Sequence, residues 1–196
     1  MTKPSVFSRG FTLIELMITV SIAALLLLIA VPSLTSFRRN AELTSVANKV
    51  VASINAARGE AMKRGMSAYM VPLDNGSDWG IGWASFVDKS ATRTRTYNAA
   101  AEGAVAIQQA IPSGLTVVGN GTAVGAQAYI MFDASGFSRD KSGGFGALTF
   151  TIRRNDVTAA EQPEQTRFVI VSATGRVRVC KPSSASDTNC NATLAN

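Results

Sequence analysis

The sequence RGFTLIELMITVSIAALLLLIAVPSL occupies residues 9–34 and contains one continuous apolar segment. From Phe11 to Val31 this segment has a single charged residue, Glu15. About 20 apolar residues, each rising about 1.5 Å in an α-helix, are enough to cross the ~30 Å hydrocarbon core of a bilayer. The segment therefore predicts a helix that spans a membrane.

A short basic segment, MTKPSVFSRG, precedes the apolar one. A secretory signal peptide carries its cleavage site after the apolar region, whereas the small residue in a cleavage-like setting here, Gly10, comes before it. Cleavage after Gly10 would keep the apolar helix in the mature protein. Because basic flanks stay on the cytoplasmic side, the chain after Val31 is expected to lie outside the cytoplasm.

Glu15 argues against the simplest alternative, which is a plain membrane anchor. A carboxylate inside a membrane helix costs about 2.5–3.5 kcal/mol on insertion scales, and such a group usually has a charged partner. A free amine on Phe11, released by cleavage, would supply that partner.

These residues resemble the N-terminus of type IV pilins and of the related pseudopilins of type II secretion. The matching features are a basic leader (residues 1–10), then Phe11, Glu15 and an apolar run that ends at Pro32. The resemblance implies that a prepilin peptidase cuts between Gly10 and Phe11, that the Phe11 amine is N-methylated, and that Glu15 neutralises an N-terminal amine in the filament. It also implies a bacterial inner-membrane protein with a periplasmic domain, which an assembly platform in that membrane adds to other major and minor pilins.

An amphipathic segment, residues 33–65, continues the helix beyond the membrane segment, residues 11–32. Pro32 lacks a backbone N–H and is expected to kink or locally melt the helix. Beyond it, apolar residues recur at spacings of three and four, which predicts one buried helix face: Leu43, Val46, Ala47, Val50, Ile54, Ala57 and Ala61. The helix is expected to run from Phe11 to Arg64 and to end at Gly65.

Residues 66–196 show the alternation typical of β-strands, with many turn-forming glycines between them. Asn98–Gln109 fits either a loop or a short strand, and Asn155–Gln165 is expected to be an exposed loop. The sequence predicts an α+β protein, in which the long helix packs on one or two antiparallel sheets. The expected strands are Ser67–Leu73, Ile81–Asp88, Leu115–Val118, Ala128–Asp133, Leu148–Arg153, Arg167–Ser172 and Arg176–Cys180.

This β-rich body resembles the GspH/FimT group of minor pilins and pseudopilins. Three fragments carry the resemblance: RGEAMKR at residues 58–64, WGIGW at residues 79–83 and GRVRVC at residues 175–180. Together with the N-terminus they imply a type IV pilin-like fold. Trp79 and Trp83 are expected in the core or at subunit contacts rather than on a ligand-binding surface.

The last expected strand places Arg176 and Arg178 on one face and Val177 and Val179 on the other. The valines are expected to pack into the sheet while both guanidiniums face water. Arginine's planar fork suits phosphate. Exposed arginines on an edge strand also discourage edge pairing, so the pattern alone leaves both explanations open.

The resemblance adds a function for this strand. In FimT-like minor pilins a GRxR motif is associated with DNA binding during natural transformation, and Gly175, Arg176 and Arg178 match it. Lys181 and Arg167 lie nearby in the sequence and are further candidate contacts for double-stranded DNA.

Cys180 and Cys190 are the only cysteines of the chain. In the oxidising periplasm they are expected to form a disulfide, with two free thiols as the alternative. A disulfide would hold the residues between them beside the two arginines.

The composition argues against an enzyme. The 196 residues include no His, which excludes Ser-His-Asp and Cys-His catalysis, and two cysteines are too few for a Cys-rich zinc site. We therefore expect no cofactor and no catalytic residue. The predicted function is that of a minor type IV pilin that helps start or cap the pilus and contributes to DNA capture. The main alternative is a GspH-like pseudopilin of type II secretion, and an enzyme with a pilin-like anchor is disfavoured because no site stands out.

Overall fold

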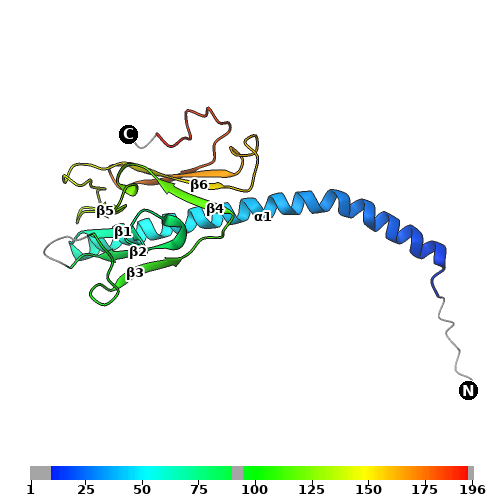
Figure 1. Cartoon of the computed structure of the whole chain (residues 1–196), viewed down its shortest axis with the longest axis horizontal. Helices are drawn as coiled ribbons and strands as arrows, with labels where there is room; N and C mark the ends of the chain where they lie inside the picture. The colour runs from blue at the N-terminus through cyan, green and yellow to red at the C-terminus, as the bar shows by residue number, and fades with distance from the viewer. Residues whose placement is uncertain (1–9, 90–94, 194–196) are drawn as a thin grey trace, which may run out of the picture. The chain divides into compact units, whose positions relative to one another are not determined.

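The computed structural model describes residues 10–89 and 95–193 (Figure 1). The chain forms two compact units, one up to Asn40 and one from Ala41 onward, and each is described by itself. Most of the expected leader, residues 1–9, lies outside the described residues.

Helix α1 (Leu13–Arg64) begins in the first unit with a reciprocal hydrogen-bonded cap. The backbone N–H of Thr12 donates to Glu15 Oε2 over 2.9 Å, and the Glu15 N–H donates to Thr12 Oγ1 over 3.2 Å. This capping box satisfies two backbone donors that a helix start otherwise leaves free. Glu15 therefore has a local structural role that the sequence analysis missed.

The apolar part of α1 is long enough to cross a membrane. Its described side chains, from Leu13 to Leu28, are exposed in the isolated chain. The helix continues across Pro32, so of the two expected effects, a kink or local melting, the melting does not occur. One missing N–H removes one hydrogen bond, which the flanking helical turns tolerate.

In the second unit α1 buries one face. Each of the seven residues predicted for this face is at most 2% exposed, which confirms the predicted stripe. The helix ends at Arg64, and Gly65 follows with a φ of +64°, a left-handed conformation that glycine adopts without steric cost.

Two four-stranded antiparallel sheets pack with this half of the helix. The first has the order β3-β2-β1-β5, and the second has the order β4-β6-β7-β8. The strands of the first sheet are β1 (Ala68–Pro72), β2 (Gly82–Val87), β3 (Ala104–Gln109) and β5 (Ile130–Phe132). Those of the second are β4 (Leu115–Gly119), β6 (Leu148–Arg154), β7 (Thr166–Val171) and β8 (Val177–Cys180).

The sequence located these strands closely. Six of the seven expected strands agree with the structure to within one residue at each end, and β5 is shorter than Ala128–Asp133. The undecided segment Asn98–Gln109 contains strand β3, and residues 155–165 are a loop as expected. Two short 3-10 helices, η1 (Trp79–Ile81) and η2 (Gly121–Ala123), complete the described elements.

The core lies where the helix stripe meets the inner faces of both sheets. Its residues come from α1, β1, β2, β4, β5, β6 and β7, and in Figure 1 the cyan part of α1 runs alongside these strands. Trp79 and Trp83 are buried there, as expected. Their indole N–H groups donate to the carbonyl of Ala123 over 3.0 Å and to Ser53 Oγ over 2.9 Å, so neither buried donor is left unsatisfied.

A buried arginine joins the helix to the second sheet. Arg154, on β6, donates to Glu42 Oε2 of α1 over 2.7 Å and to both carboxylate oxygens of Asp156. The hydrogen bonds that Arg154 donates to Asp156 and then to Glu42 raise the pKa of the guanidinium, although burial opposes them. Arg154 lies at the inward-facing end of a strand, and two carboxylates compensate its buried charge there.

We predict that Arg154→Ala lowers the unfolding free energy of the full-length protein in detergent by about 2–3 kcal/mol. The substitution removes charge-assisted hydrogen bonds and leaves a cavity. Circular dichroism during thermal unfolding measures the effect. Arg153→Ala removes the same charge from the exposed neighbouring position and should change stability by less than about 0.5 kcal/mol. Equal losses in the two variants would contradict the structural role of Arg154.

Candidate functional site

The GRxR motif lies at the tip of a tight hairpin formed by β7 and β8. We call residues 166–180 the arginine hairpin. Its turn is closed by hydrogen bonds from Gly175 N to Ser172 O (2.8 Å) and from Ser172 N to Arg176 O (3.0 Å). The Ser172 hydroxyl also accepts from Arg176 N over 3.2 Å. These bonds set the direction in which the chain leaves the turn.

Gly175 allows the hairpin to dock closely on its neighbours. Its φ is +77°, and a Cβ built at this position would lie 2.1 Å from the carbonyl oxygen of Gly136 and 2.6 Å from Arg58 Nε. No side chain fits in that space, and residues with a β-carbon rarely adopt this left-handed backbone conformation. The glycine of the motif is therefore required by packing, whatever the arginines bind.

Arg58, on α1, ties the hairpin to a second loop. Its Nε donates to Gly136 O over 2.9 Å, and its Nη2 donates to Thr174 O over 3.2 Å. In the sequence, Arg58 stands out only as part of the fragment RGEAMKR. Its role depends on two carbonyls that lie 78 and 116 residues away in the chain, which no local pattern reveals.

Both motif arginines are exposed. Within residues 10–89 and 95–193, no carboxylate lies within ion-pair distance of Arg176 or Arg178. Of the valines between and after them, Val177 packs partly against the core, but Val179 is 41% exposed. The expectation that both valines pack into the sheet is wrong for Val179, because β8 is the edge strand and little structure covers its end.

Arg167 does not belong to this exposed set, and its burial does not support the prediction that it contacts DNA. It is only 9% exposed, and its Nη1 donates to the carbonyls of Glu164 and Thr166. Burial lowers the pKa of this guanidinium. The reason is strand alternation: Arg167 shares the inward-facing side of β7 with Val169 and Val171.

Lys181 is partly exposed but already has a partner. Its ammonium forms an ion pair with the carboxylate of Glu164. This pair offsets the charge of Lys181, so among the described residues Arg176 and Arg178 are the cations of the predicted DNA site that have no carboxylate partner.

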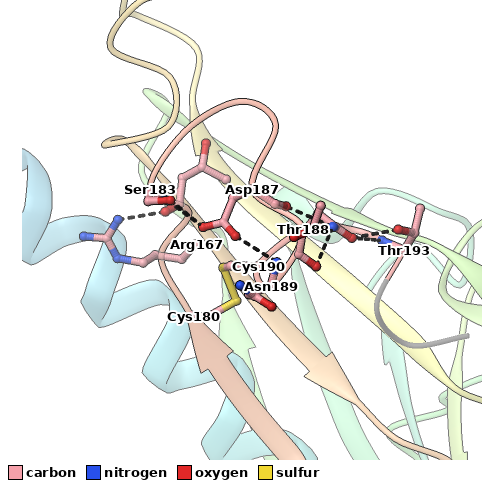
Figure 2. The surroundings of a disulfide bond; sticks show 10 residues. Arg167, Cys180, Ser183, Asp187, Thr188, Asn189, Cys190 and Thr193 are labelled. Carbon is pink, nitrogen blue, oxygen red and sulfur yellow. Dashed lines mark hydrogen bonds between the residues drawn. A yellow bond between two sulfur atoms is a disulfide. The ribbon is translucent and has the colours of Figure 1, made fainter.

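The predicted disulfide is present between Cys180 and Cys190, whose Cα atoms are 5.9 Å apart (Figure 2). Asp187 orders the loop between them by accepting from the backbone N–H groups of Ser183 and Asn189, each over 2.8 Å. These bonds, the one from Ser183 first, lower the pKa of the Asp187 carboxyl. The loop is thus held in a defined local fold.

A further contact holds the end of the tail. Asn120 Nδ2 donates to Ala192 O over 2.7 Å, while Asn120 Oδ1 accepts from Thr149 N over 2.6 Å. Through this amide the tail is fixed to β6. Among the described residues, no group of His, Cys, Asp and Glu could hold a metal ion.

The long apolar-to-amphipathic helix, packed through its second half on two antiparallel sheets, defines a pilin-type subunit. Residues 7–31 match the prokaryotic N-terminal methylation motif, and residues 46–175 match the family model of the type II transport protein GspH. The chain belongs to this GspH family within the type IV pilin and pseudopilin superfamily. The family match ends at Gly175, so both motif arginines and both cysteines lie beyond it.

Solved structures with the same fold include two crystal structures of the type IV minor pilin FimU from Pseudomonas aeruginosa PAO1. They are 21% and 22% identical to this chain, with TM-scores of 0.51 and 0.54. The alignments cover 72% and 76% of this chain and 98% of FimU. The minor pseudopilin EpsH of the Vibrio cholerae type II secretion system is 13% identical, with a TM-score of 0.46, over 73% of this chain and 99% of EpsH. No curated protein sequence matches the chain.

We predict that Gly175→Ala destabilises the protein by about 2–4 kcal/mol, because it adds a steric clash to an unfavourable backbone conformation. Gly143→Ala is the matched control. Gly143 has a similar φ of +83°, but nothing lies within 4 Å of a Cβ built there. It should cost only about 1 kcal/mol. Thermal unfolding of both variants separates the clash from the backbone strain, and equal losses would show that the close docking of Gly175 is unimportant.

Proposed function

We propose that this protein is a minor subunit of a type IV pilus and that it contacts DNA through Arg176 and Arg178. The observation that carries the proposal is the presence of two exposed guanidiniums that have no carboxylate partner among the described residues, on a hairpin that is docked on the helix and on a neighbouring loop. Two residues of extended chain separate them by about 6–7 Å. Side chains at this spacing can reach neighbouring phosphates of one strand.

Binding of this kind is electrostatic and independent of base sequence. Because Arg167 is buried and Lys181 is paired with Glu164, each subunit offers two strong phosphate contacts rather than four. A single subunit should therefore bind weakly. Several subunits in one fibre would bind more tightly, because the second and later contacts become intramolecular.

The rest of the proposal concerns assembly. A prepilin peptidase removes residues 1–10 in the membrane, and methylation follows on Phe11. The β-rich domain lies in the periplasm until the assembly platform adds the subunit to other pilins. Glu15 supports the expected neutralisation of an N-terminal amine, because its carboxylate already folds back to the nitrogen of Thr12, one residue from Phe11. The role is structural and not enzymatic.

We predict that Arg176→Ala combined with Arg178→Ala weakens binding of duplex DNA by the detergent-solubilised full-length protein. Each phosphate contact contributes about −0.9 to the slope of log K against log salt concentration, so the slope should become about 1.8 units less steep. Fluorescence anisotropy over a series of salt concentrations measures both quantities.

The matched control for this variant combines Lys49→Ala with Arg153→Ala. Both residues are exposed, and together they remove the same charge from outside the hairpin. This control should keep most of the affinity. Identical affinities for duplex DNA and identical salt slopes in the hairpin variant and the native protein would contradict the DNA-binding proposal.

The second candidate function is that of a minor pseudopilin in a type II secretion system, which the match to the family of the type II transport protein GspH favours. Deletion of the gene separates the two functions. We expect loss of pili or of DNA uptake with normal protein secretion, measured by electron microscopy, transformation frequency and the exported proteins of the culture medium. Loss of secretion with normal pili and normal transformation would favour the pseudopilin instead.

A further inference from the structure

The loop between β5 and β6 carries an exposed phenylalanine backed by an arginine. The guanidinium of Arg139 lies 4.4 Å from the ring centre of Phe145 and 5.8 Å from that of Phe137. The two rings meet edge to face, with centres 5.5 Å apart. Phe145 is 61% exposed, so much of its ring surface faces water. We call Phe137, Arg139 and Phe145 the aromatic stack.

This stack is held in place before any ligand binds. Arg139 Nε donates to Asp133 Oδ2 over 2.6 Å, and Asp133 Oδ1 accepts from the backbone of Ser135 and Phe137. Burial raises the pKa of Asp133, but the bonds from Arg139, Phe137 and Ser135 outweigh it and leave this pKa below its usual value. A short bridge also pairs Arg139 with Phe145 in antiparallel fashion. An exposed apolar ring with so many supporting bonds is well organised for a contact.

The loop that carries the stack lies against the arginine hairpin. The N–H of Ser138 donates to the carbonyl of Ala173 over 3.0 Å, and Gly175 approaches Gly136 so closely that no β-carbon fits between them. Phe137 therefore lies between two residues that both contact the turn before Arg176. The bridging hydrogen bonds of Arg58 lock the same two segments together.

We propose that Phe145 is a stacking site for an unpaired DNA base, on the loop that contacts the turn before Arg176 and Arg178. This inference rests on the proposed function. Every base has an aromatic face, so stacking on an exposed ring is independent of sequence, and nearby cations hold the backbone. Arg139 lies over the Phe145 ring, and the exposed part of this side chain is available to a base. In a duplex the bases already stack on one another, so the site selects single strands and frayed duplex ends.

The test compares two labelled probes, a short oligothymidylate and a duplex of the same length, on the detergent-solubilised full-length protein. Phe145→Ala should weaken oligothymidylate binding by about fivefold to a hundredfold, the range expected for one stacked base. Duplex affinity should change by less than about twofold, and the salt slope should stay the same because no phosphate contact is lost. Phe145→Trp should retain binding of both probes.

Ile107→Ala is the matched control, because Ile107 is an apolar residue of β3 with a similar exposure of 50%. It should change binding of neither probe. Thermal unfolding of each variant checks that the fold is intact, and retained oligothymidylate binding by Phe145→Trp supports stacking rather than a general structural role.

Three results separate this inference from the proposed function. If the variant lacking Arg176 and Arg178 no longer binds either probe and Phe145→Ala binds both normally, the stacking site is overturned and DNA binding stands. If Phe145→Ala no longer copurifies with other pilins but still binds both probes normally, the stack is a subunit contact and the inference is overturned. If removal of both arginines affects neither probe, the proposed function itself fails.

Discussion

Burial of the apolar stripe on the second half of α1 is the constraint on which the rest of this structure depends. A stripe of Leu, Ile, Val and Ala covers only one face of the helix, and the inner faces of both sheets are needed to remove it from water. The small residues Ala57 and Ala61 complete the stripe near the end of the helix and are fully buried. Arg154 extends this arrangement by pairing a strand end with Glu42 of the helix.

The same constraint positions the functional surface. The end of the helix carries Arg58, and the two loops that approach it are those of Gly136 and Gly175. Helix packing thus places an aromatic loop and an arginine-bearing turn side by side, although their residues are far apart in the chain. The disulfide and Asn120 fix the tail separately, so the arginines remain exposed.

Sequence reasoning was most successful where a pattern is local. The helix stripe, the helix end at Gly65 and most strand positions follow from spacing and from glycine, because periodicity reports which side is buried. Prediction from the sequence failed where a residue's role depends on which face of a sheet is buried, because the sequence alone does not say which face that is. Arg167 was grouped with Arg176 and Arg178 by proximity in sequence, yet it lies on the inward side of its strand.

The sequence by itself determined the class of this protein, because the methylation motif, the apolar helix and the paired cysteines each lie within one short stretch of the chain. It also identified the two exposed arginines. Only the tertiary structure decided that Lys181 is neutralised by Glu164, that Gly175 is required for docking, and that Phe145 stands on a supported loop beside the hairpin. The physical reason is that ion pairing, steric fit and exposure are properties of neighbours in space, and these neighbours come from distant parts of the chain.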